Sequence, residues 1–456
     1  MGLLNKISAW RETKRGVKHC TFNPNGPGVV RIHLIPPRFS LFKNPPYIVI
    51  LNGYYLLPLG PSWALLLSRF IDEVNAFDGK PITDEAYKEI AARTVRRTAK
   101  AYPVVSSGAL YDDLLDMTQI LFAIARGENA DVEIEKMSLR TYAAYMKAPH
   151  RMDLMVSAMT DRMGRWQCNQ KCMFCYAAGE QLGKTKEMTL AEWCDVIEKL
   201  RRAGVPMLTF TGGEPTGRAD LAQMISHAKW FVTRLNTNGT RLDAELVAAL
   251  CAAELDSVQI TLYAADAEIH NKLVGGMHHQ ETVAGIRTAL AGGLDVSVNT
   301  PLCRLNADYI STLRFLFELG VRFVTVSGLI CTGSAAHDHA QYDLTKEELF
   351  GILREAKAFC DEHGMEIDFT SPGLVDAVAL ESIGMRVPAC GAALSNMAIA
   401  PDGTVIPCQS WLGTGGALGN ILTDDFDTVW THPLAKKLRG MTDDAAKSCP
   451  FRGEDI

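Results

Sequence analysis

Short apolar runs alternate with amphipathic segments through the middle of the chain. The apolar runs that predict β-strands are Met152–Ala158, Met207–Thr211, Phe231–Asn236, Ser257–Tyr263, Asp295–Thr300 and Phe323–Ser327. Helices are predicted between them at Leu221–Lys229, Leu242–Ala253, Glu281–Leu290 and Tyr309–Leu319. A further helix begins after Thr189, which has the spacing of a capping box with Glu192. Leu190, Trp193 and Ile197 share one face of that helix.

Strands that alternate with helices predict a parallel α/β fold. The six strands and five intervening helices fit a partial (β/α)6 TIM-like barrel, open where a full barrel would add two more units. A doubly wound open sheet is the alternative from the pattern alone. In a barrel, the loops at the carboxyl ends of the strands are expected to form the functional site.

The segments on either side of this region have a different pattern. Before it, strands are predicted at Val29–Leu34 and Tyr47–Leu51, and helices at Ser62–Val74, Asp84–Ala101 and Ala109–Arg126. After it, Lys346–His363 predicts a helix, and the rest of the chain is rich in loops. We therefore predict an N-terminal α+β accessory domain at 1–148, winged-helix-like in its elements, the barrel at 149–345, and a loop-rich C-terminal domain at 346–456.

Composition and charge narrow the classes of function. With 456 residues, 47% of them hydrophobic, and a net charge of −6, the chain lacks the basic excess of a general nucleic-acid binder. No apolar run approaches the ~20 residues of a membrane span, and no secretory pattern is present, so we expect a cytoplasmic protein. Leu3, Ile7 and Trp10 predict a short surface helix, for which a basic helix lying on a membrane is the alternative.

Three of the twelve cysteines stand in one short run, at Cys168, Cys172 and Cys175. They offer three thiolates to a metal centre, and an iron–sulfur cluster held in this way has one iron open to a small molecule. A zinc knuckle is the alternative, but structural zinc is closed by four ligands, and no second cysteine pair flanks the run. Without a signal peptide, a disulfide framework is not expected.

Phe174 stands just before the last cysteine of this run, and C-x-x-x-C-x-x-C with an aromatic at that position resembles the cluster motif of the radical S-adenosylmethionine (SAM) enzymes. The resemblance implies a 4Fe–4S cluster on Cys168, Cys172 and Cys175, whose open iron is chelated by the amino and carboxylate groups of SAM. It also implies that one electron cleaves SAM and that the resulting 5′-deoxyadenosyl radical abstracts a hydrogen atom.

Further segments at predicted strand ends agree with the same family. They are Gly212-Gly213-Glu214-Pro215, Asn236-Thr237-Asn238-Gly239 and Gln259-Ile260-Thr261-Leu262-Tyr263. Glycines let a backbone approach a ligand closely and a carboxylate pairs with an ammonium group, although each segment alone is equally a turn at a strand end. The resemblance implies that SAM is bound by Phe174, Tyr176, Gly212, Gly213, Glu214, Asn236, Asn238, Thr261 and Asn299. Many relatives have H-D-x-x-R-G where this chain reads H-N-K-L-V-G from His270, so Thr261 is expected at the SAM carboxylate in place of an arginine.

The C-terminal region contains a second cysteine pattern. Cys390, the segment Gly403–Cys408 and the segment Leu418–Ile421 resemble the opening of the SPASM domain, which binds auxiliary iron–sulfur clusters. The next expected C-P-x-x-C motif begins at Cys449, but Arg452 stands at the position of its second cysteine. The resemblance therefore implies one auxiliary 4Fe–4S cluster on Cys390, Cys408 and Cys449. Buried structural cysteines in a small lobe are the alternative.

Two other cysteines are candidates for a catalytic role. Cys303 and Cys331 follow the fifth and sixth predicted strands, at the rim where a substrate would lie. Either thiol would return a hydrogen atom if the reaction were an epimerisation, and packing in the rim is the alternative role for both.

Within the superfamily, such an auxiliary domain is typical of enzymes that modify peptides. The resemblance thus implies an oxidoreductase-type peptide maturase that forms a thioether or carbon–carbon crosslink or another modification. The implied partners are a precursor peptide and a flavodoxin- or ferredoxin-type electron donor, with no nucleic acid. Many such maturases bind a leader peptide as an added strand on an N-terminal winged-helix unit, a role that we predict for residues 29–126.

Two alternatives to a peptide maturase remain at this point. One is an enzyme that acts on a small molecule, as the molybdenum-cofactor cyclase does, but the arginine-rich glycine tail of that cyclase is missing after Cys449. The other is an iron–sulfur electron carrier, in which the strand-end segments would have no cofactor to bind.

Overall fold

The computed structural model describes residues 16–22, 29–38, 45–77, 82–128, 137–159, 167–178, 187–330 and 332–450. The chain divides into two compact units. The first comprises residues 1–148 together with 199–206, and the second comprises residues 149–198 together with 207–456. Each unit has its own sheet, of four strands in the first and ten in the second.

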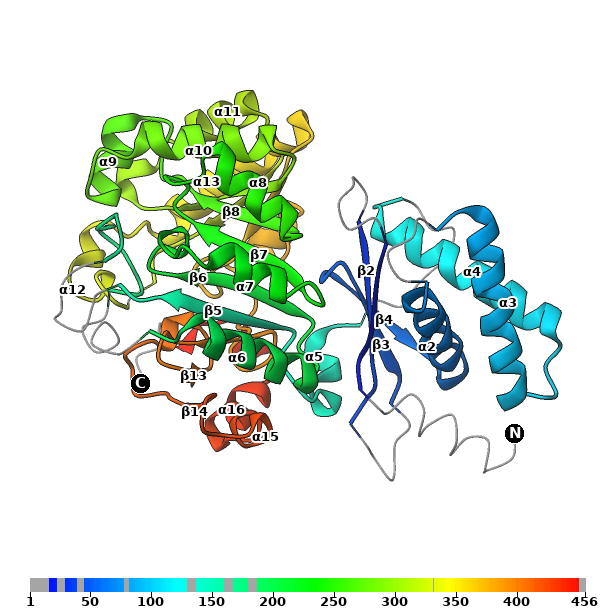
Figure 1. The fold of residues 1–456 in the computed structure, drawn as a ribbon. Helices are drawn as coiled ribbons and strands as arrows, with labels where there is room; N and C mark the ends of the chain where they lie inside the picture. The colour runs from blue at the N-terminus through cyan, green and yellow to red at the C-terminus, as the bar shows by residue number, and fades with distance from the viewer. Residues whose placement is uncertain are drawn as a thin grey trace. The chain divides into compact units, whose positions relative to one another are not determined.

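The first unit is an antiparallel sheet whose three long helices lie on one face (Figure 1). Its strands are β1 (Lys18–Phe22), β2 (Val30–Ile35), β3 (Tyr47–Leu51) and β4 (Tyr55–Leu59), paired in chain order. Its long helices are α2 (Pro61–Asn75), α3 (Asp84–Ala101) and α4 (Ser107–Ala125), followed by the short α5 (Leu139–Tyr142) with the 3₁₀ turn η1 (Ala143–Tyr145). Alternate strand residues such as Ile32, Leu34 and Val49 form one core with Phe70 of α2 and Leu114 of α4.

The sequence predicts two of these strands and all three long helices. β1 and β4 were not predicted, and both are edge strands of the sheet. β4 contains Pro58, which has no backbone N–H and is tolerated only where one side of a strand needs no partner. The amphipathic segment predicted around Leu3, Ile7 and Trp10 lies outside the described residues.

The second unit contains all six strands predicted for the barrel. They are β5 (Arg151–Ser157), β6 (Met207–Gly212), β7 (Val232–Thr237), β8 (Ser257–Thr261), β9 (Asp295–Pro301) and β10 (Phe323–Ser327), followed by a seventh parallel strand, β11 (Glu366–Phe369). These strands lie side by side in chain order, as Figure 1 shows from β5 to β8. Because the order never reverses, right-handed crossovers place every connecting helix on the same face. The sheet is therefore an open barrel wall, and the doubly wound alternative, which needs a reversal of strand order, is excluded.

The helices of this unit include the six that were predicted, and two further helices, at Ala267–Val274 and Ala335–Asp338, that were not. They are α6 (Leu190–Ala203), α7 (Leu221–His227), α8 (Ala244–Ala252), α9 (Ala267–Val274), α10 (His279–Ala291), α11 (Tyr309–Leu319), α12 (Ala335–Asp338) and α13 (Lys346–His363), with the 3₁₀ turns η3 (Pro215–Gly217), η4 (Arg304–Asn306) and η5 (His339–Gln341). The capping box before α6 is confirmed, because Thr189 N donates to Glu192 Oε2 at 2.7 Å and Glu192 N donates to Thr189 Oγ1 at 3.3 Å.

The side chains of the barrel strands separate into two faces. Along β8, Val258 and Ile260 are fully buried, whereas Gln259 and Thr261 are partly exposed. β9 and β10 repeat this alternation. Since the helices cover one face, the apolar positions pack against them and the polar positions face the interior of the barrel.

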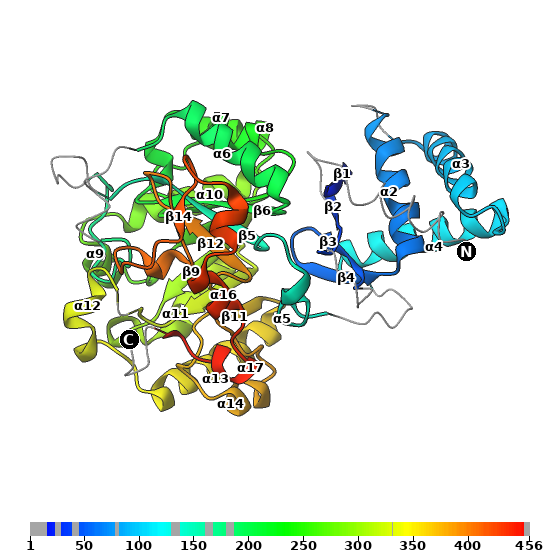
Figure 2. The ribbon, with the colours of Figure 1, turned by 90° about the horizontal axis from the view of Figure 1, so that it is seen from below.

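The C-terminal region continues the same sheet on the other side of β5 (Figure 2). After α14 (Ala377–Ser382), strand β12 (Asn396–Ile399) pairs with β5 in parallel, and β13 (Thr404–Ile406) and β14 (Gly419–Asn420) add antiparallel pairs. The remaining elements are η6 (Gln409–Trp411), α15 (Phe426–Trp430), α16 (Pro433–Arg439) and α17 (Asp443–Ala446). The domain boundary predicted at residue 345 falls inside this unit, because α13 and β11 extend the barrel beyond it.

Among the described helices, none combines the length and the apolar character that a membrane crossing requires.

Candidate active site and auxiliary cluster site

The loop with three cysteines follows β5, and the end of α9 holds its backbone in place. Lys171 N donates to Val274 O at 3.0 Å, and Met173 N donates to Leu273 O at 2.8 Å. Gly275 ends α9 with a φ of +69°, and a Cβ at this position would lie 2.5 Å from Lys171 O. A glycine is therefore needed both for the left-handed conformation and for the close approach of the loop.

The thiols of Cys168, Cys172 and Cys175 lie close enough for their charges to act on one another. Burial raises the pKa of Cys168 to about 11, and the charge of Cys175 contributes to this increase. Burial also raises the pKa of Cys172, with contributions from both of the other thiols. In the part of the chain that the structure describes, no three His, Cys, Asp or Glu side chains could hold a single metal ion together. Ligands of an iron–sulfur cluster bind different iron atoms and do not converge on one point, so the three thiols fit such a cluster.

The aromatic residue of the run, Phe174, packs inside the barrel unit. It belongs to an apolar cluster with Tyr263, Leu273 and Cys303, and its ring makes an edge contact with Tyr342 at 5.5 Å between centroids. The predicted contact of Phe174 with SAM stays a prediction, and the packing shows that the ring anchors the cysteine loop.

Gly212 and Gly213, predicted to approach a ligand, approach the end of β5. A Cβ on Gly212, whose φ is +142°, would lie 2.4 Å from Ser157 O, and one on Gly213 would lie 2.8 Å from Ala158 O. Gly213 N also donates to Ser157 O at 2.9 Å. Glycine is therefore needed at both positions so that the end of β6 can lie against the strand that leads into the cysteine loop.

The Glu214 carboxylate joins the ends of β6 and β7. It is 5% exposed, and its Oε1 accepts hydrogen bonds from Thr216 Oγ1 at 2.5 Å and Thr237 Oγ1 at 2.6 Å. Oε2 accepts one from Asn238 N at 2.8 Å. A carboxylate oxygen can accept two hydrogen bonds, so Oε2 keeps the capacity to meet an ammonium group.

Asn238 and Asn236 differ in how their side chains are satisfied. Asn238 Nδ2 donates to Asn169 Oδ1 at 2.8 Å, and Asn169 Nδ2 donates to Thr240 Oγ1 at 2.7 Å, which ties the end of β7 to the cysteine loop. Asn236 Oδ1 is buried without a hydrogen-bond partner, as is Ser157 Oγ at the end of β5. Buried polar atoms without a partner are rare and costly, so these two fit a site that receives polar groups of a cofactor.

Thr261 and Asn299 end neighbouring strands and face each other in the ladder of β8 and β9. Asn299 Oδ1 accepts a hydrogen bond from Thr325 Oγ1 at 2.8 Å, and Gln259 Nε2 donates to the same Thr325 hydroxyl at 3.1 Å. The predicted cofactor residues of β8 and β9 thus belong to a polar network on the interior face of the barrel.

Tyr176 connects the cysteine loop to the C-terminal region. Its hydroxyl donates to Gln409 Oε1 at 2.5 Å, and its ring packs with Met155, Ala398 and Trp411 in one apolar cluster that also contains Cys168 and Cys175. Sequence reasoning predicted Tyr176 as a residue that binds SAM, and that role stays a prediction.

The three C-terminal cysteines also lie close together. Burial raises the pKa of Cys408 to about 12, and the charges of Cys390 and Cys449 raise it further. Cys390 N donates to Ala446 O at 2.6 Å, which places the segment before β12 beside α17. The thiols of these three residues therefore form a second set that fits an iron–sulfur cluster.

The Leu418–Ile421 segment braces the hairpin that leads to Cys408. Asn420 Nδ2 donates to Asp402 O at 3.0 Å, and Ile421 N donates to Gly403 O at 2.8 Å. Gly403 has a φ of +87°, and a Cβ there would meet Asn420 Oδ1 at 2.8 Å. The structure of the hairpin thus explains why a glycine and an asparagine stand at these two positions of the motif.

Of the two candidate catalytic thiols, the structure describes Cys303. Cys303 is 0% exposed and lies in the apolar cluster of Phe174 and Tyr263, because the turn η4 folds over it. Burial also raises the pKa of its thiol. Cys303 therefore has the packed position that was the alternative to a catalytic role, and its catalytic role stays a prediction. Cys331 lies outside the described residues.

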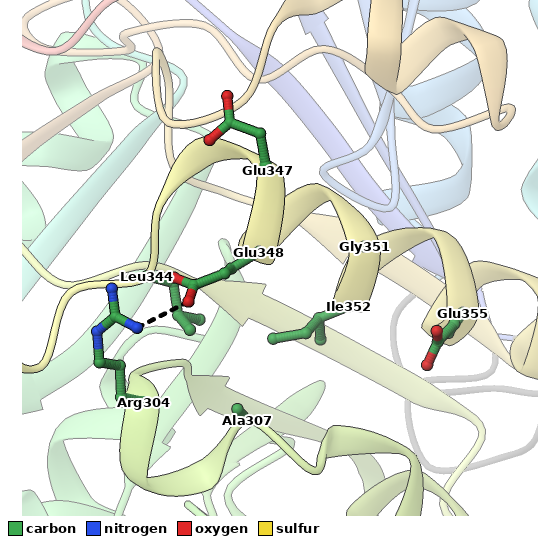
Figure 3. A pocket seen from close by; sticks show the side chains of 8 residues that line it. All are labelled: Arg304, Ala307, Leu344, Glu347, Glu348, Gly351, Ile352 and Glu355. Carbon is green, nitrogen blue, oxygen red and sulfur yellow. Dashed lines mark hydrogen bonds and ion pairs between the residues drawn. The ribbon is translucent and has the colours of Figure 1, made fainter.

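A pocket of about 380 Å³ lies between η4 and α13 (Figure 3). It is lined by Arg304, Ala307, Leu344, Glu347, Glu348, Gly351, Ile352 and Glu355. Arg304 Nη1 is already paired with Glu348 Oε1 at 2.7 Å. Neither cysteine set borders this pocket, so its lining has no part in the site described above.

Sequence reasoning did not identify three residues that shape the site. They are Asn169, Ser157 and Gln409. Asn169 and Gln409 stand directly beside predicted cluster ligands, and Ser157 ends the strand before the first cysteine run. Polar residues adjacent to predicted ligands are the signal that could have found them.

Comparisons with known proteins agree with this arrangement. Residues 167–326 match the radical SAM superfamily, and residues 390–450 match the iron–sulfur cluster-binding domain called SPASM. The PqqA peptide cyclase of Streptomyces rochei is 27% identical over 298 residues, which are 63% of this chain and 80% of that protein.

Solved structures show the same fold at low sequence identity. SuiB of Streptococcus suis bound to the precursor peptide SuiA has a TM-score of 0.60 at 15% identity and covers 87% of this chain and 88% of SuiB. SuiB bound to S-adenosylmethionine also has a TM-score of 0.60 at 15% identity, and covers 89% of this chain and 91% of SuiB.

The domain matches identify the cofactors. The radical SAM domain implies a 4Fe–4S cluster and SAM, and the SPASM domain implies auxiliary iron–sulfur binding. The cysteine sets and the free polar atoms at the strand ends fit these groups. This chain is therefore a radical SAM enzyme with a C-terminal SPASM domain.

Proposed function

We propose that this enzyme modifies a peptide, by removing a hydrogen atom and forming a thioether or carbon–carbon crosslink or another modification. Two relatives support the proposal: the name of the PqqA peptide cyclase specifies a peptide substrate, and the structure of SuiB contains a precursor peptide. Within this chain, the proposal rests most directly on the Tyr176–Gln409 hydrogen bond, which joins the cysteine loop after β5 to the second cysteine set.

The proposed roles of the residues follow from their positions. When bound, the cluster and SAM supply a one-electron reduction and a carbon radical that takes a hydrogen atom. Cys168, Cys172 and Cys175 are assigned to hold this cluster. Ser157 Oγ and Asn236 Oδ1 are assigned to hydrogen bonds with SAM, since both are buried and free. Glu214, Asn238, Thr261 and Asn299 are assigned to the same cofactor from the neighbouring strand ends.

Cys390, Cys408 and Cys449 are assigned to hold the auxiliary cluster. With three protein ligands such a cluster has an open iron, which could bind a substrate thiolate and so favour thioether formation. Held by the same three cysteines, the cluster would alternatively supply an acceptor for the electron that the substrate radical must lose. A flavodoxin- or ferredoxin-type protein is proposed as the external electron donor.

The N-terminal unit is proposed to bind a leader peptide as an additional strand. β1 and β4 are the edge strands of its sheet, and an extended peptide can pair with such an edge through backbone hydrogen bonds. Pro58 removes a backbone donor from β4. β1 is therefore the edge that we propose for the peptide.

Cluster content is the first test. After anaerobic reconstitution, the enzyme is expected to hold about eight irons per chain, and a variant with Cys390, Cys408 and Cys449 changed to Ala is expected to hold about four. Cys194→Ala is the matched control, since Cys194 lies on α6 and belongs to neither set. A content of four irons in both proteins would exclude the auxiliary cluster.

Product analysis is the second test. The reconstituted enzyme is incubated with SAM, a reductant and candidate precursor peptides encoded near its gene, and both 5′-deoxyadenosine and the peptide mass are measured. Formation of 5′-deoxyadenosine with a changed peptide mass would support the proposal. If a small molecule increased the formation of 5′-deoxyadenosine while the mass of every peptide stayed unchanged, the small-molecule alternative would be indicated instead.

A further inference from the structure

Two residues that directly follow predicted cluster ligands are joined by a hydrogen bond. Tyr176 follows Cys175, and Gln409 follows Cys408. The Tyr176 hydroxyl donates to Gln409 Oε1 at 2.5 Å, although the two residues are 233 positions apart in the chain. Each partner is thus one residue from a ligand of a different cluster.

This hydrogen bond is partly buried and borders an apolar cluster. The ring of Tyr176 packs with Met155, Ala398 and Trp411, and Cys168 and Cys175 border the same apolar cluster. A hydrogen bond beside apolar side chains is stronger than one in open water.

Other contacts show that Tyr176 lies between the two cysteine sets. Burial raises the pKa of the Tyr176 phenol, and the charges of Cys175 and Cys408 act in the same direction, so both thiols are near the ring. A hydrogen bond from Thr211, at the end of β6, reaches the same phenol oxygen. The hydroxyl is therefore fixed by the barrel on one side and by the SPASM domain on the other.

We propose that the Tyr176–Gln409 hydrogen bond is a positioning contact that fixes the two cluster-binding loops relative to each other and tunes the reduction potentials of both clusters. Hydrogen bonds and solvent exposure around the ligands set the potential of an iron–sulfur cluster, and outer-shell partners orient those ligands. Tyr176 itself is not oxidised in this scheme. The proposal depends on the two clusters and not on the identity of the substrate.

The test uses spectroscopy of the full-length reconstituted enzyme. Tyr176→Phe removes the donor and keeps the ring, and Gln409→Leu removes the acceptor at similar volume. Each variant is expected to change the electron paramagnetic resonance spectrum and the midpoint potential of both clusters. The expected size is about a tenfold change in the ratio of reduced to oxidised cluster at a fixed potential, which is the lower end of the effects that outer-shell substitutions have on metal affinity or activity. The double variant is expected to differ little from Tyr176→Phe, because Tyr176→Phe already removes the bond to Gln409, together with the one from Thr211.

Two further variants keep the proposal open to refutation. Tyr342→Phe is the matched control, because Tyr342 also packs against the cysteine loop, through Phe174. It is expected to leave the auxiliary cluster unchanged. Gln409→Glu is the second variant, used if Gln409→Leu loses iron or fails to fold. It keeps an acceptor oxygen and is expected to restore the hydrogen bond with Tyr176. The proposal is wrong if Tyr176→Phe leaves the auxiliary signal unchanged, or if the effects of the two single variants simply add.

Discussion

The sequence predicts that Glu214 binds SAM, and the structure shows that its side chain also holds neighbouring strand ends together. Its carboxylate accepts hydrogen bonds from Thr216, Thr237 and Asn238, which come from two successive strand ends. These bonds hold the segment after β7 in the position from which Asn238 reaches the cysteine loop at Asn169. Any contact of Glu214 with the cofactor is therefore added to a carboxylate that the protein has already oriented.

His270 gives a prediction about pH at the same scale. It is 0% exposed, its Nδ1 accepts a hydrogen bond from Tyr263 N at 3.2 Å, and burial, with His279 and His278 nearby, lowers its pKa to about 3. The unfolded chain, with a pKa near the ordinary value of 6.5, binds the proton more readily between pH 6.5 and 3, so stability is complete above pH 6.5 and is lost as the pH falls. By pH 4.5 the loss from this residue is expected to be roughly 2 kcal/mol.

The measurement is the free energy of unfolding as a function of pH. In His270→Gln the amide oxygen can still accept from Tyr263 N, and the curve between pH 6.5 and 4.5 is expected to be flatter than that of the wild type. His227→Gln changes a histidine whose side chain is 40% exposed and is expected to leave the slope unchanged. Equal slopes in all three proteins would show that another group causes the acid sensitivity.

At the scale of elements, the cysteine loop depends on the helix end that supports it. Gly275 and Gly364 both end helices in the left-handed conformation, with φ of +69° and +63°. A Cβ on Gly275 would lie 2.5 Å from Lys171 O, whereas nothing lies within 4 Å of one on Gly364. Gly364→Ala is therefore expected to cost about 1 kcal/mol of stability from backbone strain alone.

Gly275→Ala is expected to show the same strain and, in addition, to displace the loop between Cys168 and Cys172. The measurement is iron bound per chain after reconstitution, with the midpoint of thermal unfolding recorded for both variants. We expect reduced iron in Gly275→Ala and full iron in Gly364→Ala. If both variants bound iron equally, the contact of Gly275 with Lys171 would have no part in cluster binding.

The elements that the sequence predicted share long or strongly periodic patterns. The six barrel strands and the helices between them have such patterns, and all were found. The strands that were missed are short or lie at edges: β1, β4 and β11–β14. Six helices of four to seven residues were also missed: α5, α12 and α14–α17. The eight-residue α9 was also missed, because it is too short for a clear period.

The contacts within the site could not be predicted from the sequence in the same way. Motifs and resemblance placed each predicted site residue at a strand or loop end. The pairing of Asn238 with Asn169, or of Tyr176 with Gln409, joins residues 69 and 233 positions apart. Such a pair depends on which strands become neighbours, and neither periodicity nor residue type contains that information.

At the scale of the whole molecule, the SPASM region does not have a sheet of its own. β12 pairs in parallel with β5, and β5 is also the strand that leads into the cysteine loop. Residues 149–198 and 207–456 accordingly form one compact unit. Both cluster-binding regions are therefore expected to unfold together rather than in separate steps.

A proline in β12 tests this cooperativity. Ala398 is fully buried, pairs with Asp153 of β5 and with Ile406 of β13, and lies in the apolar cluster that contains Tyr176. Ala398→Pro removes a backbone donor in the middle of a sheet and is expected to cost about 3 kcal/mol. Ala377→Pro is the matched control, because Ala377 is the first residue of α14, where proline is tolerated.

In hydrogen-exchange measurements, Ala398→Pro is expected to lower the protection of β5 and β6 as much as that of β13. If protection fell only in β12–β14, the SPASM region would be unfolding on its own, and the continuous sheet would not make the two cluster regions one cooperative unit.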